Sequence, residues 1–125
     1  MEFDFKLKNP DLLRRREEYN NLKLKYPDKI ALICEKDPKS KLYGIEKTKY
    51  LIPGDLAVGQ FSSMLRKKLD LSKEEAFFLL INGKHSVTGD TLMSELYDKY
   101  KDEDGFLYVS YSSELTWGIF NKLIK

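Results

Sequence analysis

The chain has 125 residues, which is enough for one domain and leaves little room for a second. Its residues are 42% hydrophobic and 34% charged, which favours a modest core under a well-solvated surface, and the net charge of +2 is too small by itself to indicate nucleic-acid binding. No run of about 18 apolar residues occurs and the N-terminus lacks an apolar segment, so we expect neither a membrane-spanning helix nor a secretory signal.

The first predicted elements are helical. Asn9 as an N-cap, followed by Pro10 in the first turn, predicts a helix that ends at Tyr26, because the next residue is also proline. Phe3 and Leu7 lie four residues apart, which is compatible with a shorter helix before Pro10. The apolar face of the longer helix repeats at steps of three or four residues, at Leu12, Arg16, Tyr19, Leu22 and Tyr26.

The rest of the chain alternates between strands and helices. Ile30 to Cys34 is predicted to be a strand, and because both of its faces are apolar we expect it to lie inside a sheet. The elements predicted after it are a loop over 36–47, a strand over 49–52, a helix from Val58 to Leu69, a strand over 77–81 with a turn at Asn82-Gly83, a helix from Leu92 to Tyr100 with Asp90 as its cap, and a strand over 107–111. This order, ββαβ(α)β after an N-terminal helical extension, is that of a ubiquitin-type β-grasp, an α+β fold.

An ordered set of short segments extends from about residue 3 to Gly118. The segments are Lys25-Tyr26-Pro27-Asp28, Ile33-Cys34-Glu35-Lys36, Lys49-Tyr50-Leu51-Ile52-Pro53, Asp55-Leu56, Val58-Gly59-Gln60-Phe61, the run from Lys101 to Val109, Tyr111-Ser112 and Trp117-Gly118. In order and spacing they resemble the autophagy ubiquitin-like modifiers, the group of the microtubule-associated light chain 3 and the GABA-receptor-associated protein. The resemblance implies a ubiquitin-like β-grasp with two additional N-terminal helices. Residues 1–27 would form the helical extension, 28–118 the β-grasp core, and 119–125 a C-terminal extension removed by processing.

By this resemblance the C-terminus is the site of conjugation. A processing cysteine protease would cleave between Gly118 and Ile119, and the activating and conjugating enzymes of the ubiquitin-like pathway would then carry Gly118 as a thioester. The glycine would finally be joined to phosphatidylethanolamine, so the protein is expected in the cytoplasm and, when lipidated, on the autophagosome membrane. Trp117 keeps a large aromatic residue where the family usually has Phe or Tyr. The alternative is that Gly118 is an ordinary glycine near the chain end. The apolar, basic segment after it is either a disposable extension or a weak membrane-surface contact.

The strand over 49–52 is the candidate binding site. Lys49 and Leu51 are predicted to point to one side and Tyr50 and Ile52 to the other, and if the strand is an edge its backbone can pair with an extended ligand. The resemblance implies ligands with aromatic-x-x-aliphatic motifs, as in cargo receptors. The aromatic pocket would comprise Glu18 (or its neighbour Glu17), Leu22, Ala31, Ile33, Lys49, Leu51 and Phe106. The aliphatic pocket would comprise Tyr50, Ile52, Pro53, Leu56, Phe61, Met64 and Leu65. Each apolar residue taken alone would instead be assigned to the core.

Several positions depart from the family pattern. Ala31 replaces a proline, Thr48 replaces a lysine beside Lys47 and Lys49, and Ala57 replaces a threonine cap. These changes affect ligand preference, because Ala31 widens the aromatic pocket and Thr48 thins the basic rim that would attract acidic residues flanking the motif.

Other functions find little support in the sequence. Cys34 lies in an apolar strand and His85, the only histidine, in a predicted loop, so we expect no enzyme, no metal site and no cofactor. The basic cluster at Arg14-Arg15-Arg16 is either a solvated helix face or a contact for acidic lipids or an acidic partner such as tubulin, and nucleic-acid binding is not expected. The rival to a lipid-conjugated modifier is a non-conjugated ubiquitin-fold adaptor that binds partner proteins or the cytoskeleton.

Overall fold

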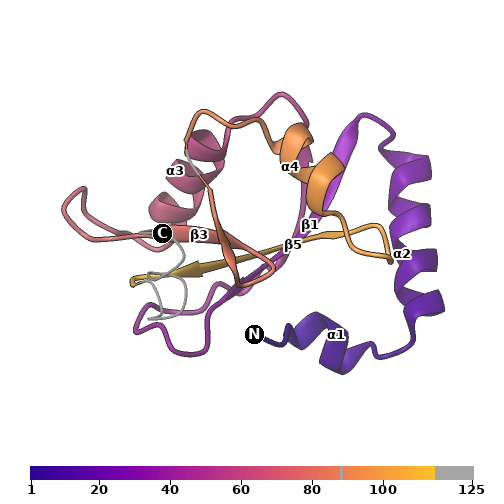
Figure 1. The fold of residues 1–125 in the computed structure, drawn as a ribbon, viewed down its shortest axis with the longest axis horizontal. Coiled ribbons are helices and arrows are strands. Elements are labelled where there is room, and N and C mark those ends of the chain that lie inside the picture. Colours follow the sequence, from indigo (N-terminus) through magenta and orange to yellow (C-terminus); the bar gives the residue numbers. More distant parts are fainter. Residues whose placement is uncertain (88, 115–125) are drawn as a thin grey trace.

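A five-stranded mixed sheet organises the computed structural model, which describes residues 1–87 and 89–114 (Figure 1). The strands are β1 (Lys29–Lys36), β2 (Lys49–Pro53), β3 (Phe78–Ile81), β4 (His85–Ser86) and β5 (Leu107–Ser112). They lie in the order β2-β1-β5-β3-β4, with β1 and β5 parallel and the other neighbours antiparallel. The expectation that β1 lies inside the sheet is confirmed, and β2 is an edge strand.

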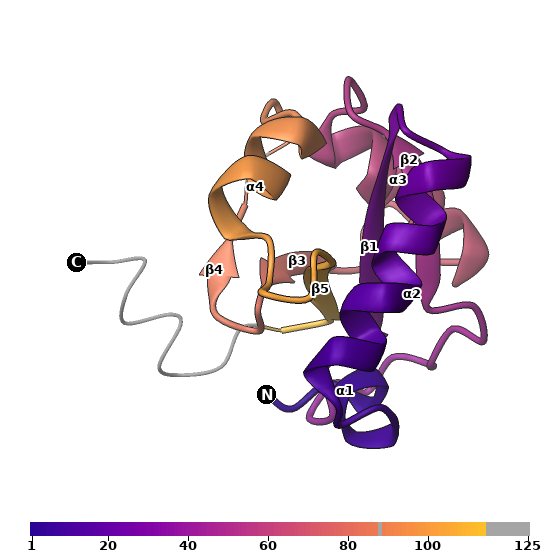
Figure 2. The same ribbon diagram turned by 90° about the vertical axis from the view of Figure 1, so that its right-hand side faces the viewer.

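Helices cover both faces of this sheet, as Figure 2 shows for α2 in front of β1 and α3 behind it. The helices are α1 (Asp4–Lys8), α2 (Leu12–Lys25), α3 (Val58–Lys68) and α4 (Met93–Tyr100). The larger core cluster joins α3 and α4 to one face, through residues such as Phe61, Leu65 and Met93. A smaller cluster joins α1 and α2 to the other face, around Ala31 and Phe106. No described helix combines the length and the apolar character that a membrane span requires.

The start of α2 differs from the sequence prediction. Asp11, not Asn9, is the N-cap, and its carboxylate accepts a hydrogen bond of 3.0 Å from the Leu13 N–H. Asn9 instead ends α1, since its side-chain amide donates to the Phe5 carbonyl at 2.9 Å. The proline at position 10 therefore lies between two helices and not in the first turn of the second.

The buried face of α2 also differs from the prediction. Arg15 is 8% exposed, whereas Arg16 and Tyr26, which the predicted face included, are exposed. The reason is electrostatic, because Arg15 pairs with the fully buried carboxylate of Asp104. A pattern that counts apolar residues does not predict a buried ion pair.

The later elements agree with the sequence in kind, with two corrections. Asp90 does not cap α4, since the N-cap is Leu92, which makes no side-chain cap bond, and the Met93 N–H donates to the Leu56 carbonyl at 2.8 Å instead. The strand β4 was not predicted, and it contains His85, which was assigned to a loop. In α3, Gln60 caps the first turn by accepting the Ala57 N–H at 2.9 Å.

Candidate functional site

The outer side of β2 offers an unpaired backbone. The Cys34 N–H donates to the Thr48 carbonyl at 2.7 Å, and the register continues this antiparallel pairing to Tyr50 and Ile52. Residues in such a ladder alternate between bonding toward the neighbouring strand and pointing away from it. The N–H and C=O groups of Lys49 and Leu51 therefore face the open side, where no residue of the described chain pairs with them. An extended peptide can add a strand at this edge.

The residues expected in the aromatic pocket lie together on the face of the sheet covered by α2. Ala31, Ile33 and Phe106 are buried in the smaller core cluster, with Leu22 and Leu51 half-buried against it. The three buried residues, Ala31, Ile33 and Phe106, can form only the bottom of a pocket, which we call the aromatic floor. A ligand can reach the half-buried Leu22 and Leu51.

A charged pair lies beside this floor. Glu18, not Glu17, forms an ion pair with Lys49, and the side chains of both partners are more than a third exposed. The Lys49 ammonium also lies 5.4 Å from the centre of the Phe5 ring. Lys49 thus joins β2 to both N-terminal helices at the rim of the aromatic floor.

The residues expected in the aliphatic pocket lie on the opposite face, between β2 and α3. Tyr50, Ile52, Phe61 and Leu65 are buried in the larger core cluster, Leu56 and Met64 are half-buried at its margin, and Pro53 is exposed. A ligand can therefore reach the last three, while the first four support them. Burial raises the pKa of Tyr50 to about 12, and the ammonium groups of Lys47 and Lys68 each lie 5.0 Å from the centre of its ring.

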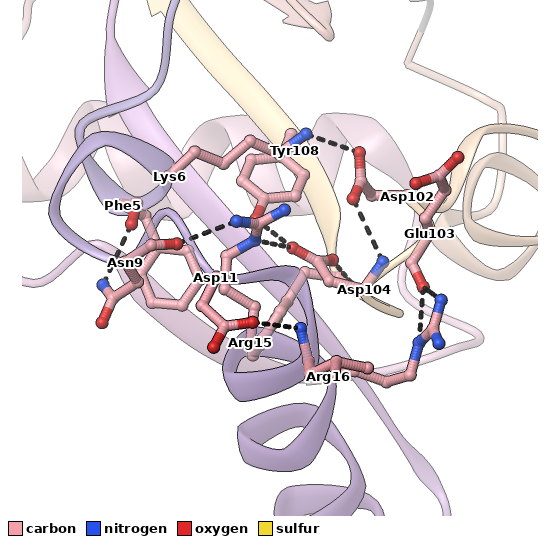
Figure 3. Close-up of polar contacts among 12 residues, drawn as sticks. Phe5, Lys6, Asn9, Asp11, Arg15, Arg16, Asp102, Glu103, Asp104 and Tyr108 are labelled. Atoms are coloured by element: carbon pink, nitrogen blue, oxygen red, sulfur yellow. Dashed lines mark hydrogen bonds and ion pairs between the residues drawn. The ribbon is translucent and has the colours of Figure 1, made fainter.

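The buried carboxylate of Asp104 lies between Arg15 of α2 and Tyr108 of β5 (Figure 3). Asp104 accepts hydrogen bonds from the Arg15 guanidinium at 2.9 Å, from the Phe106 N–H at 2.8 Å and from the Tyr108 hydroxyl. Burial is the largest single influence and opposes the charge on Arg15, but the hydrogen bond to Asp104 and the nearby negative charges together outweigh it and raise the pKa of Arg15. Burial and the Asp104 charge together raise the pKa of Tyr108. This network fixes α2 and Phe106 relative to each other.

The one cysteine and the one histidine lie apart. Cys34 is fully buried in β1, and burial raises the pKa of its thiol. His85 is exposed in β4, stacked on the Tyr100 ring at 5.0 Å between ring centres, and two strands separate β4 from β1. Within residues 1–87 and 89–114, no three His, Cys, Asp or Glu side chains are grouped as metal ligands.

Comparison with known proteins assigns the family. The family model described as "Autophagy protein Atg8 ubiquitin like" matches residues 14–118. The chain belongs to the Atg8 family. It is 47% identical over 114 residues to autophagy-related protein 8e of Arabidopsis thaliana, covering 91% of this chain and 92% of the relative. It is 48% identical over 105 residues to autophagy-related protein 8 of Schizosaccharomyces pombe, covering 84% and 86%.

A solved structure shows the same fold. The crystal structure of Trypanosoma brucei ATG8 matches with a TM-score of 0.84 at 37% identity, over 94% of this chain and all of that one. The protein is therefore an autophagy-related ubiquitin-like protein with the α+β fold that its sequence predicts.

The expected conjugation site of this Atg8-family chain, Gly118, lies outside the described residues, and so do its neighbours Trp117 and Ile119. The last described residues continue directly from β5. There the Ser113 N–H donates to the Ser40 hydroxyl at 3.2 Å, and the Ser112 hydroxyl donates to the Glu114 carbonyl at 2.6 Å.

Sequence reasoning missed the residues that support the aromatic floor. Asp104 and Gly105 occur in a segment that resembles the family, but no role was assigned to them. Tyr19 was assigned only to a helix face. An acidic residue next to a glycine immediately before a strand is the one local signal that indicates a constrained turn here.

Proposed function

We propose that this Atg8-family protein is a modifier that is cleaved after Gly118 and joined to phosphatidylethanolamine, and that it then recruits motif-bearing cargo receptors to the autophagosome membrane. Before this the protein would reside in the cytoplasm. The observation on which the proposal rests is the open edge of β2, with a cluster of ligand-accessible apolar side chains on each side of it. Family membership supports the conjugation step.

In the conjugation step the chain is a substrate. The amine of the lipid attacks the carbonyl carbon of the Gly118 thioester, a C–N bond forms, the C–S bond breaks, and the thiol of the conjugating enzyme leaves with the proton that the amine loses. Glycine suits this reaction because no Cβ obstructs its carboxyl group. The chemistry is performed by other proteins, so this chain would not itself be an enzyme.

In the recruitment step a ligand strand pairs with the backbone of Lys49 and Leu51. Its aromatic side chain would lie against Leu22, Leu51 and the buried floor, and its aliphatic side chain would contact the accessible residues Leu56 and Met64. Lys47 and Lys49 would attract acidic residues that flank the motif.

Gly118→Ala tests the conjugation step. We expect the intact mass of the native protein from cells to equal that of a chain ending at Gly118 with the lipid attached. We expect the Gly118→Ala variant to stay in the soluble fraction. Gly44→Ala is a matched control, since a Cβ at Gly44 would meet no atom within 4 Å. Wild-type protein that remains intact to Lys125, together with unchanged membrane targeting of Gly118→Ala, would favour the non-conjugated adaptor.

Leu51→Ala tests the groove separately. Calorimetry should show that an aromatic-x-x-aliphatic peptide binds the variant at least about tenfold more weakly than wild type, because a buried leucine contact is worth about 1.5–3 kcal/mol. Leu24→Ala, which truncates a leucine that is 82% exposed on α2, should leave the affinity unchanged. Equal affinities of wild type and Leu51→Ala would remove this groove from the proposal.

A further inference from the structure

Phe106, at the centre of the aromatic floor, is held between two other rings. The Tyr19 ring meets it edge-on at 5.6 Å and 76°, and the Phe5 ring meets it at 5.3 Å and 72°. Phe106 itself is fully buried. Because aromatic rings in this geometry pack at van der Waals contact, the floor can deepen only if one of the two flanking rings moves.

Tyr19 is prevented from moving by the turn before β5. Gly105 has φ +98°, and a Cβ at this position would overlap the Tyr19 ring, so the ring lies directly over the glycine backbone. The Tyr97 hydroxyl, from α4, donates to the Gly105 carbonyl at 2.8 Å. Since a hydroxyl has one proton, the hydrogen bond between the two tyrosine hydroxyls must be donated by Tyr19. The ring is thus packed on its face and hydrogen-bonded at its end.

We propose that Tyr19, held by Tyr97, is a specificity-determining residue that limits the aromatic pocket to a single six-membered ring. Phenylalanine or tyrosine in the ligand would be preferred over tryptophan, whose indole needs a deeper or wider pocket. Ala31, on β1, is buried in the same cluster and contributes only a methyl group, so the large side chain that limits the pocket comes from the α2 side. This inference rests on the proposed peptide groove.

The test compares two peptides that bind the full-length protein. They have the same acidic flanks and the same leucine three positions after the aromatic residue, and differ only in Phe or Trp at the aromatic position. We expect wild type to bind the Phe peptide more tightly. Tyr19→Ala should shift the Phe-to-Trp affinity ratio toward Trp by at least about tenfold, because even one methylene of pocket space changes discrimination by about 10–200-fold and this substitution removes a whole ring.

Tyr97→Phe should shift the same ratio in the same direction by a smaller amount, because it removes the hydrogen bonds and keeps the ring. Tyr100→Phe, on the same helix, is the matched control and should leave the ratio unchanged, since Tyr100 stacks on His85. If circular dichroism shows that Tyr19→Ala does not fold, the Phe-to-Trp affinity ratio of Tyr97→Phe alone tests the inference.

Two results would overturn the inference while leaving the groove in place. One is wild type binding the Trp peptide as tightly as the Phe peptide, and the other is an unchanged ratio in the folded variants. If wild type binds neither peptide, or if Leu51→Ala binds both as wild type does, the groove is wrong and the inference fails with it.

Discussion

At the scale of single residues, the most demanding feature is the buried charge of Asp104. Its carboxylate is fully buried and the side chain of its partner Arg15 is 9% exposed. Taking both groups out of water is costly, and the cost is recovered only because each makes further hydrogen bonds, such as that of the Arg15 guanidinium to the Asn9 carbonyl at 2.8 Å. The pair therefore depends on both partners being present.

Asp104→Asn should destabilise the protein strongly. The substitution keeps the shape of the side chain but leaves the buried Arg15 charge without the carboxylate that neutralises it, so we expect the free energy of unfolding to fall by about 3–5 kcal/mol. Urea unfolding followed by circular dichroism measures this. Asp98→Asn, on the exposed side of α4, should change it by less than about 0.5 kcal/mol. A loss below 1 kcal/mol for Asp104→Asn would mean that the network contributes little.

At the scale of elements, α1 is too short to be stable alone and depends on its attachments. The Glu35 carboxylate accepts the N–H groups of Asp4 and Phe5 at 2.7 and 3.0 Å, at the first turn of the helix. At the other side of the helix, the Lys6 ammonium contacts Asp102 at 2.6 Å and lies 4.6 Å from the centre of the Tyr108 ring. The helix is therefore attached through charged groups in addition to the apolar contact of the Phe5 ring with Phe106.

The Lys6–Asp102 pair should make the stability depend on pH. Burial is the largest single influence and acts to raise the pKa of Asp102, but the hydrogen bonds from Lys6 and the Asp104 N–H, together with the charges of Lys6 and Arg15, outweigh it and lower the pKa. A lowered pKa means that the contribution is complete above the ordinary aspartate pKa of about 4 and is lost as pH falls through the native value. Asp102→Asn should thus cost about 1 kcal/mol or less at pH 7, since the pair is partly exposed, and progressively less below about pH 4.

Unfolding curves of wild type and Asp102→Asn between pH 2 and pH 7 would measure this convergence. For Asp55→Asn, at an exposed position, the free energy of unfolding should change with pH in the same way as that of wild type over the whole range. Curves of Asp102→Asn that stay equally far from wild type at every pH would show that the carboxylate charge is not the cause.

The comparison between sequence and structure is clearest at this same scale. The strands β1 and β2 were predicted because apolar residues on both faces, or alternating side chains, are local properties of the sequence. The buried position of Arg15 could not be predicted, because its partner Asp104 is 89 residues away. Strand β4, with two residues, is too short to show any periodicity.

The same distinction applies to the candidate site. Its residues were placed through the family resemblance, and the structure gathers them around β2. What the sequence did not indicate is which of them are accessible, and that Tyr19 reaches Tyr97, 78 residues away. Both depend on how α2 and α4 pack, which no short segment specifies.

At the scale of the whole molecule, Cys34 reports on the integrity of the fold. Its thiol is fully buried in β1, and burial raises its pKa, so neither access nor the reactive thiolate is available in the native state. Iodoacetamide should therefore label Cys34 only when the protein unfolds globally, with a rate that rises with urea as the unfolded population does.

Mass spectrometry of intact protein measures this labelling. A thiol introduced by Ser63→Cys, at an exposed position of α3, should react at once without urea and serves as the reference. Labelling of Cys34 at a comparable rate without urea would show that the sheet opens locally around β1.

The parallel pairing of β1 with β5 has a consequence for the protein during its synthesis. These two strands are the first and the last of the described chain, yet they are neighbours at the centre of the sheet. Until the ribosome has added residues up to Ser112, β1 has β2 on one side and nothing on the other, with both faces apolar and half of its backbone groups unsatisfied. A nascent chain that extends only through α4 thus exposes an unpaired, apolar strand edge that is prone to aggregate. We expect chaperones to bind this edge until β5 has been synthesised.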